Sequence, residues 1–259
     1  MRNLFDLSGK VCLVTGGNGG IGLGMAEGLA AHGATVIIWG NNRDKNEAAL
    51  EKLRAYGGEV RCSKVDVTDE AAVNAGIADI LSEFGRLDQA IANAGGNIPR
   101  KDLFDIDTEA FRKVMDINLY GVLFTLKEAA RHMVERHAKG DPGGSLVGIA
   151  STAAIHGAAR NEHYGSAKGA VTSLVRGMAV EFAPKGIRVN AIAPGWTRSD
   201  MTDRLQQWDK FTTNVISRVP FGGWADGADF AGIAVYLASP ASRFHIGDTL
   251  VIDGGYVIY

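Results

Sequence analysis

The segment Thr15-Gly16-Gly17-Asn18-Gly19-Gly20-Ile21-Gly22 follows an apolar run and precedes a helical pattern. Glycine lets the backbone approach a pyrophosphate closely, and a helix N-terminus supplies N–H donors and partial positive charge. The glycines at 16, 20 and 22 are spaced Gly-x-x-x-Gly-x-Gly, unlike the commoner Gly-x-Gly-x-x-Gly fingerprint. No Gly-Lys-Ser/Thr ending follows, which argues against a P-loop nucleotidase. The context predicts a phosphate-binding turn, with a purely structural turn as the alternative.

Short apolar segments alternate with helical ones along the rest of the chain. This alternation predicts an α/β fold in which helices cover both faces of a parallel sheet. The expected strands are 11–15, 35–39, 60–65, 87–92, 145–150, 188–193 and 249–252. The expected helices are 20–32, 43–57, 69–84, 107–138, 162–183 and 225–239. The least regular segment, 196–222, is expected to be an insertion over the end of the sheet.

Composition narrows the class of protein. The 259 residues carry 27 Lys and Arg against 29 Asp and Glu, so no basic excess points to nucleic acid or an anionic membrane. No segment has the length of a secretory or membrane-spanning apolar run. Cys12 and Cys62 are expected to be reduced thiols, and no metal-ligand spacing occurs. We expect a cytoplasmic enzyme or binding protein that acts on a small molecule.

Tyr164 and Lys168 stand four residues apart in an expected helix and therefore share one face. A free phenol has a pKa near 10, and lowering it to about 7 takes about 4 kcal/mol. A nearby ammonium and the positive ring of an oxidised nicotinamide can provide this in a partly dry cleft. Such a phenol would accept the proton of an alcohol or donate one to the oxygen of a ketone. A chance Tyr-x-x-x-Lys spacing is the alternative.

Two further polar residues support this interpretation. Ser151 ends an expected strand thirteen residues before Tyr164, where a short loop would bring its hydroxyl beside the phenol. Asn118 interrupts an apolar helical face, and a buried amide needs hydrogen-bond partners. Ligands of open parallel sheets bind beyond the carboxyl ends of the strands. The candidates at those ends are Gly16, Gly40, Asp66, Asn93, Ser151 and Pro194.

At this point the chain resembles the classical short-chain dehydrogenase/reductase family over nearly its whole length. Residues 15–22 resemble the cofactor turn of the family. Asn118, Ser151, Tyr164 and Lys168 match its catalytic tetrad in order and spacing. The other matching motifs are Asn93-Ala94-Gly95 after the fourth strand, Pro194-Gly195 after the sixth, and Asp253-Gly254-Gly255 near the C-terminus.

The resemblance implies one Rossmann-type domain over residues 1–259, a seven-stranded parallel sheet, and hydride transfer between a nicotinamide and a secondary alcohol or ketone. It implies that Tyr164 is the acid/base and that Lys168 lowers its pKa and binds the nicotinamide ribose. Ser151 would position the substrate oxygen, and Asn118 would hold a water in a proton relay. The implied cofactor-binding residues are Gly16, Asn18, Gly20, Ile21, Gly22, Asn41, Arg43, Asp66, Val67, Asn93, Ala94, Gly95, Tyr164, Lys168, Pro194, Gly195 and Thr197.

The choice between NADP and NAD depends on the end of the second strand. Relatives that prefer NAD often place an acid there for the ribose 2′-hydroxyl, and Trp39-Gly40-Asn41-Asn42-Arg43 has none. Asn41 stands where relatives that prefer NADP often have arginine, and Arg43 is close enough in sequence to reach a 2′-phosphate. NADP is therefore the expected cofactor, with NAD as the alternative.

The substrate is expected to contact Ala153, His156, His163 and Trp196, with Arg198 and Trp208 as further candidates. A cyclic alcohol, a sugar derivative and a 3-oxoacyl thioester all suit this mixture of aromatic and polar residues. Relatives assemble through the long helices and the apolar tail, which implies a homotetramer. The alternatives are a non-catalytic dinucleotide-binding regulator on the same fold, or another reaction such as epimerisation or dehalogenation.

Overall fold

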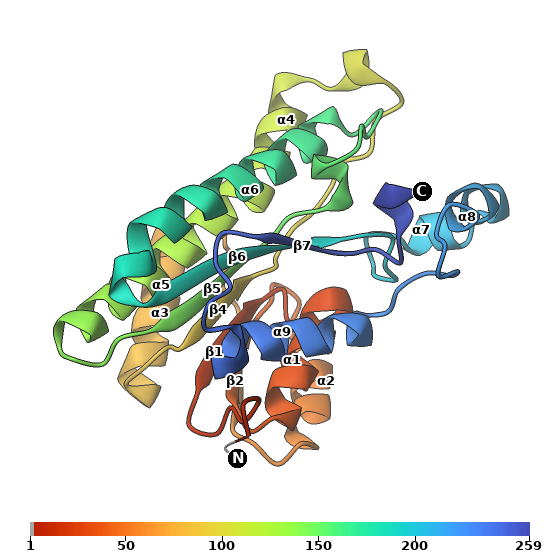
Figure 1. Ribbon diagram of the computed structural model, residues 1–259. Helices are drawn as coiled ribbons and strands as arrows, with labels where there is room; N and C mark the ends of the chain where they lie inside the picture. The colour runs from red at the N-terminus through yellow and green to blue at the C-terminus, as the bar shows by residue number, and fades with distance from the viewer. Residues whose placement is uncertain (1–2) are drawn as a thin grey trace.

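Seven parallel strands form one sheet in the computed structural model, which describes residues 3–259 (Figure 1). Their order across the sheet is β3-β2-β1-β4-β5-β6-β7, so the direction of winding reverses between β1 and β4. The predicted α/β doubly wound sheet is confirmed. The strands are β1 (Val11–Thr15), β2 (Thr35–Trp39), β3 (Val60–Ser63), β4 (Gln89–Ala92), β5 (Gly144–Ile149), β6 (Ile187–Pro194) and β7 (Thr249–Ile252).

Helices cover both faces of this sheet, as Figure 1 shows. One layer consists of α1 (Gly20–Ala31), α2 (Arg43–Arg54) and α9 (Ala231–Ala238). The other consists of α3 (Glu70–Phe84), α5 (Gly121–Ala138) and α6 (Glu162–Phe182), with α4 (Thr108–Met115) against α6. The irregular segment after β6 holds two short helices, α7 (Asp203–Gln206) and α8 (Asp209–Ile216), which stand at one end of the sheet.

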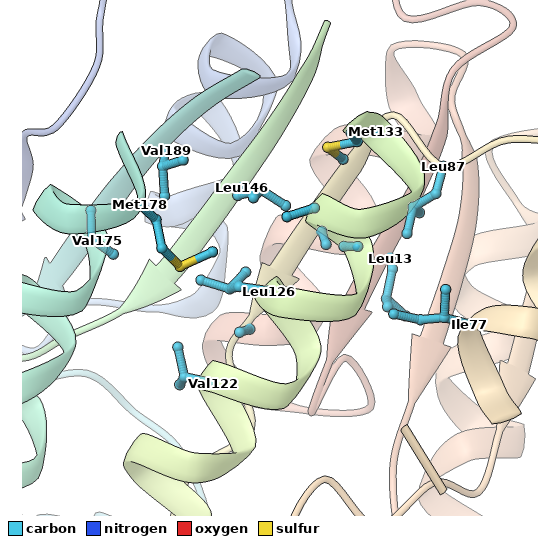
Figure 2. Close-up of a cluster of buried hydrophobic side chains, with 14 of the residues drawn as sticks. Leu13, Ile77, Leu87, Val122, Leu126, Met133, Leu146, Val175, Met178 and Val189 are labelled. Carbon is cyan, nitrogen blue, oxygen red and sulfur yellow. The ribbon is translucent and has the colours of Figure 1, made fainter. Parts of the chain in front are cut away.

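The strands are apolar on both faces because each face is buried under a helical layer. Along β1, Leu13 belongs to the core beneath α3, α5 and α6, whereas Cys12 and Val14 belong to the core beneath α1 and α9. Figure 2 shows the first of these cores, in which Leu126 and Met133 of α5 lie between the sheet and the neighbouring helices. Burial on both faces fixes the positions of the strand ends, where the candidate site residues lie.

The predicted uniform helix over 107–138 is wrong. After α4 the backbone makes a π-helical turn over Asp116–Tyr120 before α5 begins. A π turn inserts one residue and changes the direction in which the neighbouring side chains point. Asn118 lies in this turn, fully buried, and its amide nitrogen donates to Val114 O at 2.9 Å and to Gly96 O at 2.7 Å. A periodic apolar pattern cannot indicate a single inserted residue.

Other boundaries differ by a few residues. The predicted strand 60–65 ends at Ser63, and the predicted helix 43–57 ends at Arg54. The predicted helix 225–239 begins with a 3₁₀ turn, Gly227–Phe230, before α9. Asp69 and Asp107 cap α3 and α4, since each carboxylate accepts from a backbone N–H of the first turn.

Cys12 and Cys62 are free thiols, Cys12 buried and Cys62 partly buried. Within residues 3–259, no helix is long and apolar enough to cross a membrane.

The position of α1 depends on a contact between two glycines. A Cβ added at Gly24 would lie 1.9 Å from the carbonyl oxygen of Gly227, and one added at Gly227 would lie 2.3 Å from Gly20 O. The backbone of α1 therefore rests directly on the 3₁₀ turn before α9. This contact determines how close the start of α1, with its glycine-rich turn, lies to the 3₁₀ turn before α9.

We expect Gly24→Ala to destabilise the protein by about 1–3 kcal/mol, because overpacking forces the two backbones apart. The matched control is Gly232→Ala in α9, where an added Cβ meets no atom within 4 Å. That control should leave stability unchanged or raise it by up to about 1 kcal/mol, as alanine favours helices over glycine. Chemical denaturation of both variants checks this, and equal midpoints would contradict the packing argument.

Candidate active site

A cavity of about 430 Å³ opens at the carboxyl ends of the strands. Its walls come from the residues after β1, β2, β4, β5 and β6, from α6, and from the segment after β6. All four tetrad residues and the glycine-rich turn line this one cavity. The other predicted residues that line it are Asn41, Asp66, Val67, Asn93, Ala94, Gly95, Ala153, His156, Pro194, Gly195, Trp196 and Thr197.

The glycine-rich turn has the features of a phosphate cradle. Gly16 and Gly20 adopt positive φ angles of 62° and 50°. A Cβ at Gly22 would lie 2.2 Å from Gly16 O, so only glycine lets the turn close on the start of α1. No side chain caps α1 and no acidic residue occupies its first turn, so its first N–H groups remain available to an anion. The residues present therefore fit the diphosphate of a dinucleotide.

Two asparagines fix the shape of this cradle. The Asn93 amide nitrogen donates to Thr15 O at 3.0 Å and to Gly16 O at 3.2 Å, which ties the end of β4 to the turn. Asn18 Nδ2 donates to Asn46 Oδ1 at 2.7 Å, and the buried Asn46 donates to Gly40 O at 2.9 Å. This second chain joins the turn to the end of β2. Asn46 was not predicted, because nothing in the sequence distinguishes it from a surface asparagine of α2.

Lys168 is the buried cation of the cavity, with 3% of its surface exposed. Its amine donates to Ile149 O, at the end of β5, at 2.7 Å. A Cβ added at Gly95 would lie 2.8 Å from Asn118 Oδ1 and 3.5 Å from Lys168 Nζ, so glycine there leaves room for both groups. Burial lowers the pKa of Lys168 to about 7. The neutral form of this amine is therefore accessible near neutral pH.

Tyr164 lies one helical turn before Lys168, with the Lys168 Nζ 5.7 Å from the centre of the phenol ring. Burial raises the pKa of Tyr164, and a hydrogen bond with Ser151 partly opposes this rise. Ser151 Oγ also accepts from Ala153 N at 3.1 Å, which fixes the start of the loop after β5. The sequence predicts that a nearby ammonium together with the positive ring of an oxidised nicotinamide lowers this pKa. In the protein without cofactor the phenol stays neutral at neutral pH, as a proton donor.

Four predicted site residues lie outside the cavity lining. His163, predicted as a substrate contact, is fully buried outside the lining, and its Nε2 is 3.0 Å from Ile98 O. Successive helical residues point about 100° apart, so His163 faces away when Tyr164 faces the cavity. Arg43 is largely exposed and donates to Glu47 at 2.9 Å. Arg198 forms an ion pair with Asp226, and Trp208 stacks on Phe211. Neither Arg198 nor Trp208 lines the cavity.

The sequence analysis missed several cavity residues on loops. Asn97 and Asn161 face each other across the cavity wall, and Asn97 Nδ2 donates to Asn161 Oδ1 at 3.0 Å. Met201 and Leu205 line the cavity from the segment after β6. Asp200 also lines it and forms an ion pair with Lys45 of α2. None of these belongs to a motif, so only the loop conformation identifies them. Across the described part of the chain, no group of three or more His, Cys, Asp or Glu side chains could hold a metal ion.

Comparison with known proteins places this site in context. A family model described as enoyl-(acyl carrier protein) reductase matches residues 16–257. Gluconate 5-dehydrogenase of Gluconobacter oxydans is 36% identical over 99% of this chain and 98% of that protein. A short-chain type dehydrogenase/reductase from Mycobacterium marinum has a TM-score of 0.92 at 33% identity, covering 99% and 98% of the two chains. A Burkholderia cenocepacia gluconate 5-dehydrogenase, crystallised with NADP and tartrate, has a TM-score of 0.92 at 32% identity, covering 99% and 98%.

The low pKa of Lys168 predicts a specific pH dependence of stability. Because folding lowers this pKa from 10.5 to about 7, the cost of the buried charge is full below pH 7 and disappears as the pH approaches 10.5. Lys168→Met removes the charge, so the free energy of unfolding of the variant should exceed that of the wild type by the largest amount at low pH. The difference in unfolding free energy should shrink by up to about 1.4 kcal/mol per pH unit between these limits. Denaturant titrations at pH 6 and pH 9 measure it, and a difference independent of pH would contradict a depressed pKa.

Proposed function

Because this chain belongs to the short-chain dehydrogenase/reductase family, we propose that Tyr164, Ser151, Asn118 and Lys168 catalyse its reaction in the cavity described above. The chain is an NAD(P)-dependent oxidoreductase that acts on a secondary alcohol or ketone. The observation that carries the proposal is that all four side chains and the phosphate cradle line one cavity. Residues 1–259 form a single catalytic domain, in which 196–222 covers the substrate.

Each tetrad residue has a task that its contacts suggest. The nicotinamide, when bound, supplies or accepts the hydride. Tyr164 donates a proton to the ketone oxygen or accepts one from the alcohol, and Ser151 holds that oxygen by hydrogen bonding. Lys168 lies between the phenol and the end of β5, where its charge stabilises a phenolate. The Asn118 amide nitrogen donates to Gly96 O and Val114 O, and these hydrogen bonds keep the π turn and the cavity wall beside Lys168 in place.

The protonation states of Tyr164 and Lys168 determine how this pair can transfer a proton. Burial holds the Tyr164 phenol in its neutral form, which is the form that donates a proton. Alcohol oxidation needs the phenolate, which must be stabilised by positive charge brought close to it. Because the pKa of Lys168 is about 7, its amine can take up a proton near neutral pH when the phenolate forms. The pair therefore suits either direction, with the cofactor state deciding which one runs.

The cofactor is NADP. The Burkholderia cenocepacia relative was crystallised with NADP, and residues 40–43, directly after β2, include no acid to bind a ribose 2′-hydroxyl. Asn41 lines the cavity at that end, whereas Arg43 faces solvent beside Glu47. Lys45, in the same first turn of α2, reaches Asp200 at the cavity wall. Arg43 and Lys45 are the two cations that would meet a 2′-phosphate.

A homotetramer in the cytoplasm is the proposed working form. Val180 on α6 and Ile258 and Tyr259 in the tail expose apolar side chains to solvent. The family resemblance implies assembly through these elements, and burial of the exposed side chains would stabilise such contacts here. A non-catalytic regulator is the rival function. The intact tetrad in one cavity argues against it, because a regulator has no need of a buried lysine beside a tyrosine.

We expect Tyr164→Phe to reduce turnover by at least 10²-fold, the usual scale of a lost general acid or base. Affinity for NADPH, measured by fluorescence titration, should stay within about threefold, since the ring and its packing are retained. Tyr56→Phe, the same substitution at an exposed tyrosine outside the cavity lining, is the matched control and should keep its activity. A Tyr164→Phe enzyme with a large share of the wild-type rate would exclude the assigned role.

The assay is a panel of secondary alcohols and ketones followed at the absorbance of the reduced nicotinamide, with NAD and NADP in parallel. The panel should include cyclic alcohols, sugar derivatives and 3-oxoacyl thioesters. Turnover with NADP exceeding that with NAD supports both the reaction and the cofactor. Tight NADPH binding without turnover of any compound would favour the regulator instead.

A further inference from the structure

Four polar atoms that belong to residues of the cavity wall are buried and lack a hydrogen-bond partner in the described protein. One is Nε1 of Trp39, the last residue of β2, and the other three are Asn97 Oδ1, His156 Nε2 and Trp196 Nε1. A buried polar atom without a partner costs about 1–3 kcal/mol, so native proteins retain such atoms where a ligand or water pairs with them. The three residues follow β4, β5 and β6 respectively, and therefore surround the carboxyl edge where Tyr164 lies.

The hydrogen bonds that these residues already make decide what each free atom can do. Asn97 uses its Nδ2 on Asn161, which leaves Oδ1 as an acceptor. His156 Nδ1 lies 3.0 Å from the carbonyl oxygen of Gly157, and a carbonyl only accepts, so Nδ1 carries the hydrogen. In the neutral ring Nε2 is then an acceptor, while Trp196 Nε1 is a donor only. Together, Asn97, His156 and Trp196 offer a substrate two acceptors and one donor.

Aromatic packing holds two of these side chains in place. The His156 ring stands edge-on to Tyr256, with ring centres 5.4 Å apart. Trp196 packs edge-on against Phe211 at 5.2 Å and Trp224 at 5.9 Å. Side chains fixed in this way lose little entropy when they bind a ligand. Because His156 and Trp196 are held in place, they would favour a substrate whose polar groups lie at matching positions.

The cavity wall around these three residues carries little positive charge. Across residues 3–259, no arginine lines the cavity, and its lysine is the buried Lys168 of the tetrad. A hydroxyl both donates and accepts, so several hydroxyls match two acceptors and a donor. A single carbinol, or the apolar chain of an acyl thioester, would leave these atoms unpaired.

We infer that Asn97, His156 and Trp196 form a subsite for the additional hydroxyl groups of a polyhydroxylated substrate, such as a sugar derivative. The inference rests on the proposed function, because it places the reacting carbinol at Tyr164 and the other hydroxyls on these three residues. It selects one of the three substrate classes that the sequence left open.

The experiment compares Asn97→Leu, His156→Phe and Trp196→Phe with the wild type on two kinds of substrate. D-gluconate and sorbitol represent polyhydroxylated compounds, and cyclohexanol represents a single carbinol. Each variant should lose about 5- to 30-fold in kcat/KM on the polyhydroxylated compound that is turned over, because a hydroxyl loses its partner. The value for cyclohexanol should change by less than about twofold. His156→Gln, which keeps an acceptor, should recover part of the loss. Tyr56→Phe, at an exposed tyrosine outside the cavity lining, is the control that should change neither value.

Thermal protection by the same compounds gives a second readout. Polyhydroxylated compounds should raise the Tm of the wild type more than that of the three variants. A wild type that turns over cyclohexanol but no polyhydroxylated compound would overturn the subsite and leave the proposed function intact. Equal losses on both kinds of substrate would also overturn it. Thermal protection that depends on the three residues, without turnover of any compound, would support the subsite and contradict the proposed function.

Discussion

The buried amine of Lys168 constrains every element around the cavity. It needs an acceptor, because an unpaired buried ammonium or amine is costly, and the carbonyl of Ile149 at the end of β5 supplies it. This bond fixes α6 against the sheet, and with it the position of Tyr164 one turn earlier. The same spot requires glycine at 95, since a side chain there would meet both Lys168 and Asn118. The wall of the site is therefore built around one amine.

The two sides of the cavity use different chemistry. The cofactor side is mostly backbone, with the open N-terminus of α1, glycines at 16, 20 and 22, and amide chains that join β1 to β2 and β4. Such a surface would recognise the diphosphate by its backbone N–H groups. The substrate side is made of side chains held by aromatic contacts in the segment after β6. Relatives can therefore share the cofactor side while they differ in the substrates they accept.

Much of this arrangement could be predicted from the sequence. Apolar strands alternating with helices determine the sheet, and strand ends determine where polar residues meet, so Ser151 and Asn93 were placed correctly in the cavity. Features that depend on one inserted residue or on loop conformation could not be predicted. The π turn that holds Asn118 lies within an unbroken apolar pattern. The position of His163 outside the lining could not be predicted because a histidine beside Tyr164 can face either way, and Asn97 belongs to no motif.

The account depends on a phenol that is neutral in the protein alone and becomes a base only when positive charge is brought beside it. The most direct measurement is an ultraviolet difference titration of wild type against Tyr164→Phe, with and without oxidised NADP. The ionisation step assigned to Tyr164 should lie above pH 10 in the protein alone and move by several pH units towards neutrality with the cofactor. A step that stays in place when the cofactor binds would contradict the account.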